Sequence, residues 1–152
     1  MRTIFAGVLS ALLLTACGAS GAKSGENNNQ KIEKAMKTIH LTKAEFLDKV
    51  VNYEANPNEW KYLGDKPAIV DFYASWCGPC KMLSPVIEDL AGQYEGKALV
   101  GKVNVDEEQE LAMRYGVMSI PTVIFFKDGK EIDRKVGVMP AGAFTQVLDN
   151  NQ

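Results

Sequence analysis

The sequence has few of the residues on which several protein classes depend. Its 152 residues include only 3 cysteines, too few for a small fold held together by disulfides. Glycine occurs 13 times, far below the content of about one residue in three that a collagen needs. Neither sign of charge dominates, because 17 basic side chains face 19 acidic ones, so we expect no nucleic acid partner. The 46% of hydrophobic residues exclude a wholly disordered chain, and the length predicts one globular domain with short appendages.

The first of these appendages, residues 1–16, has the features of a secretory signal peptide. Arg2 precedes a run of apolar and small residues from Ile4 to Ala16. As a helix this run is about 20 Å long, short of the roughly 30 Å hydrocarbon core of a bilayer. We therefore predict a signal peptide rather than a membrane-spanning helix, with a buried amino-terminal helix as the alternative.

Cys17 follows this apolar run directly. The four residues that end at Cys17 are LTAC, and they resemble the lipobox of bacterial lipoproteins, in which the cysteine is acylated and becomes the first mature residue. The resemblance implies a periplasmic protein anchored by lipid to a membrane of the bacterial envelope. Soluble export with a free thiol at Cys17 is the alternative. Two acyl chains on one residue would hold the protein stably on a membrane, whereas one chain is marginal.

The rest of the segment 17–35 is predicted to be a flexible linker. Residues 18–30 are GASGAKSGENNNQ, and such small and polar residues cannot bury enough apolar surface to offset the entropy lost on ordering. The ends of this stretch would lie on the order of 20 Å apart on average. We expect the folded domain over residues 36–152.

Strand and helix patterns alternate along this domain. Apolar runs predict strands at 38–41, 68–74, 99–105, 123–126 and 131–136. Helices are predicted from Thr42 to about Asn56, and over 78–94, 106–115 and 141–149. Pro85 is expected to kink the second of them, and the pair Asp128-Gly129 predicts a hairpin. This order predicts an α/β fold, in which helices cover both faces of a mixed sheet.

Two cysteines lie where the strand at 68–74 ends and a helix begins. The residues from Trp76 to Lys81 are WCGPCK, so two residues separate Cys77 from Cys80. The active site of an open α/β sheet lies at the carboxyl ends of its strands. The amino end of a helix also favours a thiolate. We therefore predict a redox-active dithiol that can close into a disulfide.

Two other uses of this cysteine pair are open. A structural zinc site usually needs four ligands, and besides Cys17 only His40 offers another soft ligand. A purely structural disulfide would close a very short loop, which adds little stability. We predict neither a metal nor a cofactor.

The motif and its surroundings resemble the thioredoxin family over nearly all of residues 36–152. The matching segments, in chain order, are Val70–Ala74 with Trp76–Lys81, Lys102–Asp106, Gly116–Thr122, Phe126–Gly129 and Val136–Gly137. A lone C-x-x-C would be weak, but five matches in the right order are specific. The resemblance implies a thioredoxin fold and a thiol-disulfide oxidoreductase that reduces protein disulfides.

The resemblance also implies four catalytic residues. Cys77 is expected to attack a substrate disulfide, and Cys80, buried one turn on, to resolve the mixed disulfide. Asp71 matches a buried acid that helps deprotonate the resolving thiol, and Lys102 matches the lysine near it. A lone carboxyl in an apolar strand should have a raised pKa and exchange protons near neutrality. The alternative for Asp71 is a structural, hydrogen-bonded core acid.

A substrate-binding surface is implied beside the dithiol. Pro121 matches the family's cis proline, which lacks an amide hydrogen and leaves the backbone of Ile120 free to pair with an extended substrate. The other expected contributors to an apolar groove around Cys77 are Trp76, Gly78, Pro79 and Gly137.

Three features depart from the family pattern. Tyr73 stands where many members have tryptophan, and Met118-Ser119 stands where Arg-Gly is frequent. The segment 52–66 is longer than usual and contains three aromatic residues. These aromatics would cover an edge of the sheet or, alternatively, dock a partner.

The residues between the cysteines favour one direction of electron flow over the other. The Gly-Pro pair resembles reducing thioredoxins, so we predict a monomeric reductase of disulfide-containing proteins outside the cytoplasm. Such a reductase needs a donor, and the family implies a membrane-embedded thiol carrier. The alternatives are a periplasmic dithiol oxidase or isomerase, a non-catalytic peptide-binding module, and a metal-handling lipoprotein.

Overall fold

The computed structural model of the chain describes residues 38–55 and 66–152. The predicted signal peptide, Cys17, the predicted linker and residues 56–65 lie outside the described residues. Among the helices of the described part, none combines the length and the apolar character needed to cross a bilayer.

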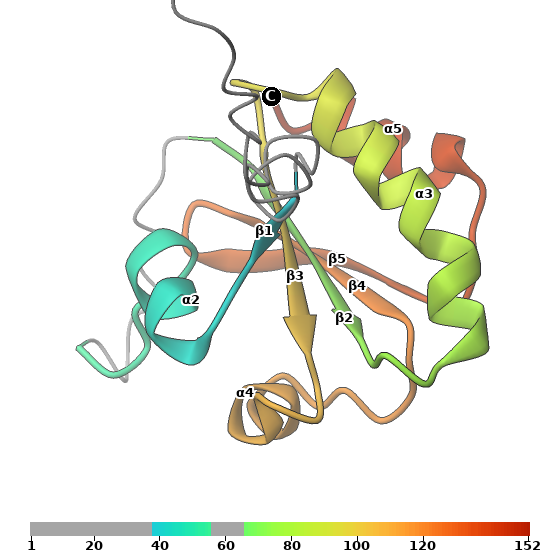
Figure 1. Cartoon of the computed structure of the whole chain (residues 1–152). Helices are drawn as coiled ribbons and strands as arrows, with labels where there is room; N and C mark the ends of the chain where they lie inside the picture. The colour runs from blue at the N-terminus through green and yellow to red at the C-terminus, as the bar shows by residue number, and fades with distance from the viewer. Residues whose placement is uncertain (1–37, 56–65) are drawn as a thin grey trace, which may run out of the picture.

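A mixed β-sheet lies at the centre of the described residues (Figure 1). Its strands are β1 (Ile39–His40), β2 (Ala68–Tyr73), β3 (Leu99–Asn104), β4 (Thr122–Lys127) and β5 (Lys130–Val136). They lie in the order β1-β3-β2-β4-β5, so β2 is central. Strands β1, β3 and β2 are parallel, whereas β4 is antiparallel to both β2 and β5. The predicted α/β fold with a mixed sheet is confirmed.

Helices cover both faces of this sheet (Figure 1). They are α2 (Lys43–Lys49), α3 (Gly78–Gln93), α4 (Gln109–Arg114) and α5 (Ala141–Asp149). Helices α3 and α5 contribute Leu83 and Phe144 to the core on one face. Helices α2 and α4 contribute Phe46 and Leu111 to the core on the other.

The alternation of side chains along β2 assigns its residues to these two faces. Val70 and Phe72 pack in the core under α2 and α4, and Ile69 packs in the core under α3 and α5. Asp71 therefore points to the α3 side of the sheet, the side on which the cysteine helix lies.

Most predicted elements agree with the structure, and two helix boundaries were wrong. Helix α2 has the predicted capping box at Thr42 but ends at Lys49, well before Asn56. The amides of Val50 and Val51 both donate to the Phe46 carbonyl, so the backbone leaves the helix while both side chains stay buried. The apolar spacing of Val50 and Val51 therefore reflects their burial and does not mean that their backbone is helical.

The second wrong boundary is the start of α4, which begins at Gln109 rather than at Asp106. The side chain of Asn104 accepts a hydrogen bond from the Asp106 amide, and its amide group donates to Glu107. Such a local turn competes with a helix for the same backbone groups. Elsewhere α5 has the predicted bounds and the hairpin turns at Asp128 and Gly129, as predicted. Pro85 lies inside α3, and the kink predicted there stays a prediction.

Candidate active site

A disulfide joins Cys77 and Cys80 at the end of β2 that faces α3. Cys77 is the N-cap residue of α3, and its sulfur accepts a hydrogen bond of 3.1 Å from the Cys80 amide. Cys80 is buried, as predicted, and Cys77 is equally so, with exposed fractions of 3% and 4%. The two sulfurs therefore differ in what surrounds them and not in total exposure.

The amino end of α3 favours negative charge on Cys77. The free amides of the first turn and the helix dipole stabilise a thiolate there, and the Cys80 amide is already directed at the Cys77 sulfur. Pro79 in the first turn lacks an amide hydrogen at a position where that hydrogen would have no partner in the helix. This geometry can perform thiol-disulfide exchange.

The segment before β4 forms one wall beside Cys77. The peptide bond between Ile120 and Pro121 is cis, as predicted, and the Ile120 carbonyl oxygen lies 3.9 Å from the Cys77 sulfur. The Gly137 amide donates to the Pro121 carbonyl over 2.8 Å. Gly137 has a φ of 84°, which favours glycine at this position. The structure thus brings Ile120, Pro121 and Gly137 together next to the dithiol.

The remaining predicted groove residues border Cys77 along the chain. Trp76 is 68% exposed, and its indole nitrogen donates to the Asp106 carboxylate over 2.8 Å. Gly78 and Pro79 are exposed in the first turn of α3. These three residues present exposed surface beside Cys77 along the chain, and Met118, three residues before Pro121, is 97% exposed.

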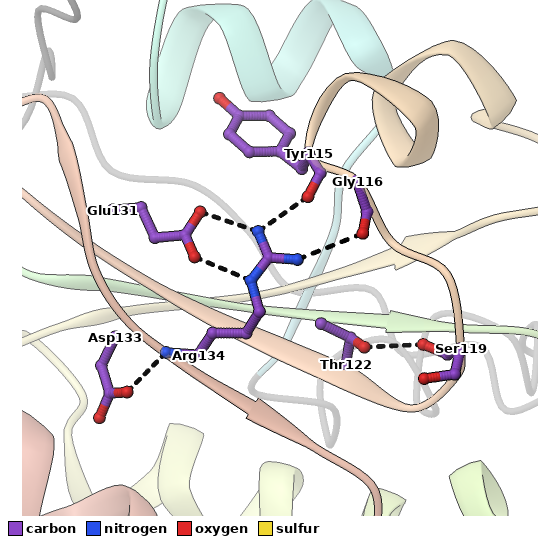
Figure 2. A network of polar contacts seen from close by, with 7 residues as sticks. All are labelled: Tyr115, Gly116, Ser119, Thr122, Glu131, Asp133 and Arg134. Carbon is purple, nitrogen blue, oxygen red and sulfur yellow. Dashed lines mark hydrogen bonds and ion pairs between the residues drawn. The ribbon is translucent and has the colours of Figure 1, made fainter.

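Arg134 on the edge strand β5 anchors the wall segment (Figure 2). Its guanidinium donates to the Tyr115 carbonyl over 2.8 Å and to the Gly116 carbonyl over 3.5 Å. Glu131 accepts two hydrogen bonds from the same guanidinium and fixes its orientation. Because these carbonyls end α4, Arg134 sets where the segment toward Pro121 begins.

The hydroxyl of Thr122 holds the same segment nearer its other end, by donating to the Ser119 carbonyl over 2.7 Å (Figure 2). The wall is therefore anchored to the sheet on both sides of the exposed Met118. Sequence reasoning did not identify Arg134, since its contacts are 18 and 19 residues away along the chain.

Asp71 is a buried acid in β2, the strand that leads to the cysteine motif. It is 1% exposed, and neither carboxyl oxygen has a hydrogen-bond partner. Burial raises the pKa of Asp71 to about 7, against a lowering by the Lys102 charge and a further rise from Glu88. No described residue donates a hydrogen bond to this carboxyl group, as the alternative of a hydrogen-bonded structural acid would require.

Lys102 is the neighbour of Asp71 on β3, at the same level of the sheet. Its ammonium donates to the Ser84 hydroxyl over 2.8 Å and lies 3.6 Å from a Glu88 carboxylate oxygen. The ammonium also lies 5.0 Å from the centre of the Tyr73 ring, within the range of a cation-π contact. Lys102 is thus held by α3 and covered by the residue that replaces the family's frequent tryptophan.

A small cavity connects Lys102 with the resolving cysteine. Its volume is about 140 Å³, and its lining residues are Tyr73, Ala74, Ser75, Cys80, Lys81, Ser84 and Lys102. A cavity of this volume has room for water, and Ser84 and Lys102 contribute polar groups to its lining.

The two residues that contact the Lys102 ammonium from α3, Ser84 and Glu88, were not predicted from the sequence. Their spacing offered a signal, because residues 80, 84 and 88 recur every four positions and so share one face of a helix. In the part of the chain that the structure describes, no group of three or more histidine, cysteine, aspartate or glutamate side chains is placed to hold a metal ion.

Comparison with known proteins agrees with this geometry. The family model described as Thioredoxin matches residues 37–150. The chain is 46% identical over 111 residues to a thioredoxin of Borreliella burgdorferi, which covers 72% of this chain and 93% of that protein. It is 54% identical over 87 residues to Thioredoxin 2 of Chlorobaculum tepidum, which covers 57% of this chain and 80% of that protein.

The family match, these relatives and the cysteine pair at the amino end of α3 support the same activity. The chain is a protein-disulfide reductase that acts on disulfide-containing substrates through Cys77 and Cys80. It has the thioredoxin fold, and it belongs to the thioredoxin family.

Proposed function

We propose that this thioredoxin works outside the cytoplasm, periplasmic and held on a membrane of the bacterial envelope by a lipid on Cys17. The observation that carries the proposal is the LTAC sequence directly after the apolar run 4–16. Cys17 is also the only cysteine of the 152 residues outside the redox pair. Once acylated, it leaves no third thiol that could exchange with the pair in an oxidising compartment.

The catalytic cycle begins at Cys77. Its thiolate attacks one sulfur of a substrate disulfide, a mixed disulfide forms, and the other substrate sulfur leaves as a thiolate that takes up a proton. Cys80 then loses its proton and attacks the Cys77 sulfur, which releases the second substrate thiol. Two electrons pass to the substrate, and the pair ends as the disulfide described above.

Asp71 accepts the proton that Cys80 loses in the second step. An acid suits this task when its pKa lies near the working pH, and burial brings the pKa of Asp71 to about 7. Lys102 adjusts the proton affinity of Asp71 through its charge. Asp71→Asn is expected to slow thiol exchange and leave the fold intact, and rates that match wild type across the pH range would remove Asp71 from the mechanism.

The substrate lies against the wall beside the dithiol. The backbone of Ile120 pairs with an extended segment of the substrate, while Trp76, Gly78, Pro79, Pro121 and Gly137 contact its side chains. The exposed indole of Trp76 and the short distance from Cys77 to the Ile120 carbonyl support this assignment.

Trapping separates catalysis from simple peptide binding. Cys80→Ser should accumulate a mixed disulfide between Cys77 and its substrates, visible on a non-reducing gel and lost on reduction. Cys77→Ser should trap nothing and should abolish disulfide reduction. If Cys77→Ser kept its full effect on substrate proteins, the chain would act as a non-catalytic binding module.

The lipid anchor is tested with the full chain expressed in a bacterium that is fed an alkyne fatty acid. The wild type should take up the label and remain with the membrane fraction, and Cys17→Ser should lose both properties. Cys77→Ser is the matched control and should stay labelled. If the wild-type protein is unlabelled and soluble, the lipid anchor is wrong and the protein is exported in soluble form.

A membrane-embedded thiol carrier supplies the electrons, because each turnover consumes one electron pair and the oxidising compartment offers no thiol pool. Equilibration of the purified chain with thiol buffers gives the potential of the pair. We expect a reduction potential of about −270 mV, as for reducing thioredoxins. A value near about −120 mV would make the protein a dithiol oxidase.

A further inference from the structure

Asp71 and Lys102 are adjacent in the sheet and yet form no ion pair. Their Cα positions are partners in the register of β2 and β3, so both side chains point to the α3 face. Neither oxygen of Asp71 accepts a hydrogen bond. The Lys102 ammonium instead contacts Ser84 and Glu88 on α3.

Helix α3 provides a site of complementary shape and charge for this ammonium. The Ser84 hydroxyl accepts one hydrogen bond from it over 2.8 Å, and a Glu88 carboxylate oxygen offers the counter-charge at 3.6 Å. The same Glu88 oxygen accepts a hydrogen bond of 2.7 Å from the hydroxyl of Thr38, which precedes β1. Thr38 thereby fixes the carboxylate on the side that meets Lys102.

Burial makes the choice of partner consequential. The side chains of Lys102 and Glu88 are 6% and 26% exposed, and charges interact more strongly away from water. Glu88 offsets part of the effect of the Lys102 charge on Asp71. Without Glu88, the uncompensated ammonium would be free to turn toward Asp71, its partner in the strand register.

We propose that Glu88 and Ser84 are positioning residues for thiol exchange: they hold the Lys102 ammonium against α3 and so leave the Asp71 carboxyl without a counter-ion, able to accept a proton from Cys80 at neutral pH. This inference rests on the function proposed above for Asp71. It gives α3 a second task, because the helix that presents the two cysteines also controls the charge that faces their proton acceptor.

The groups around Asp71 are few enough for a clean test. The charges that act on Asp71 are those of Lys102 on β3 and Glu88 on α3. Tyr73 lies two residues farther along β2, and β4 contributes the uncharged Val123 opposite Asp71. Glu88 raises the pKa of Asp71 and Lys102 lowers it. Removing the Glu88 charge and releasing the ammonium therefore act in the same direction.

The direct test is a titration of Asp71 in the oxidised full chain, purified in detergent and labelled with ¹³C at the aspartate carboxyl carbons. Asp71→Asn identifies the signal by removing it. Glu88→Gln should lower the pKa of Asp71 by about 1 or more, and Ser84→Ala should lower it by less. Asp89→Asn, which removes an exposed acid one position along α3, should change nothing. An unchanged titration in Glu88→Gln would overturn the proposal.

A double-mutant cycle separates positioning from simple charge repulsion. In a Lys102→Gln background there is no ammonium to hold, so Glu88→Gln should lower the pKa of Asp71 clearly less than it does in the wild-type background. Equal lowering in both backgrounds would show that Glu88 acts only through space, and the positioning role would be wrong.

Kinetics then connect this titration to function. If the inference holds, the pH midpoint of the exchange rate moves to lower pH in Glu88→Gln together with the titration of Asp71. A midpoint that stays in place while the titration moves would refute the link to exchange. Rates of Asp71→Asn that equal wild type at all pH values would instead refute the proposed function of Asp71 and leave the titration result standing.

Discussion

The two faces of the sheet differ in the side chains that they bury. The face under α2 and α4 is filled by aromatic and aliphatic side chains, among them Phe46, Phe72 and Phe126. The face under α3 and α5 contains, among the described residues, both buried charged side chains of the domain, Asp71 and Lys102. Both faces contribute a hydrophobic core, but in the described residues only the face under α3 and α5 also buries charged side chains.

The difference has a clear cost. A buried carboxyl without hydrogen bonds destabilises a folded protein whenever it ionises, and Asp71 is such a group. The packing of apolar side chains under α2 and α4 stabilises the fold and can offset this destabilisation. The comparison predicts that adding a carboxyl group under α2 and α4 destabilises the protein, whereas removing Asp71 from the other face stabilises it, and the predictions below test this.

The largest effect is expected from a carboxyl group on the apolar face. Val70 is fully buried there, one residue from Asp71. Val70→Asp should destabilise the protein by about 4 kcal/mol or more at pH 8, because the new charge has no partner. Asp71→Val, the matched change on the other face, should be stabilising at the same pH. Urea denaturation of both variants measures the contrast, which would vanish if Val70→Asp stayed within about 1 kcal/mol of wild type.

The second effect is the pH dependence that Asp71 imposes on stability. The pKa of this carboxyl is 3.8 without the fold and about 7 within it. Between these values the folded state holds the proton more tightly, so wild-type stability falls as pH rises, by up to about 4 kcal/mol. Asp71→Asn resembles the protonated acid at every pH and should lack this fall.

The two proteins should therefore be equally stable near pH 4, and Asp71→Asn should be the more stable one above pH 7. Urea denaturation at a series of pH values measures the difference. Parallel stability curves would show that Asp71 ionises in the folded protein as easily as in the unfolded one.

A smaller effect is expected at Arg134, whose side chain supports the wall segment from the edge of the sheet. Arg134→Gln loses the ion pair with Glu131 and the bond to the Tyr115 carbonyl, which should cost about 1 kcal/mol. The KM for a protein disulfide should rise roughly threefold, while the rate with a small aromatic disulfide stays the same. Lys135→Gln, which breaks the neighbouring pair with Asp133, is the control. Equal KM values in both variants would show that Arg134 contributes to stability but not to substrate binding.

The smallest effect concerns Trp76, which is mostly exposed. Trp76→Phe retains an aromatic ring and loses the hydrogen bond to Asp106. Stability should change by no more than about 0.5 kcal/mol, and kcat/KM for a protein substrate should decrease slightly. A loss of stability above about 1 kcal/mol would place Trp76 in the core rather than at the substrate surface.

The sequence was sufficient for elements whose signals are local. The apolar run of β2, the Asp128-Gly129 turn and the cysteine motif before α3 each depend on residues within a few positions of one another. The wrong start of α4 has a local cause of another kind. At Asn104 a side chain competes with the helix for backbone groups, and apolar periodicity does not report such competition.

The supporting side chains of the site could not be predicted in the same way. Lys102 meets Ser84 across 18 residues, and Thr38 meets Glu88 across 50. These contacts exist only once β3 lies beside β2 and α3 packs on that face. The residue types were visible in the sequence, but the pairing of each lysine and carboxylate depends on the folded arrangement.

The burial of both sulfurs in one narrow location has a consequence for kinetics. The substrate and the electron donor must approach the same Cys77 atom past the same wall, so the protein cannot hold both at once. Its steady-state rates should therefore follow a ping-pong pattern. An excess of the substrate should inhibit binding of the electron donor, and an excess of the donor should inhibit binding of the substrate.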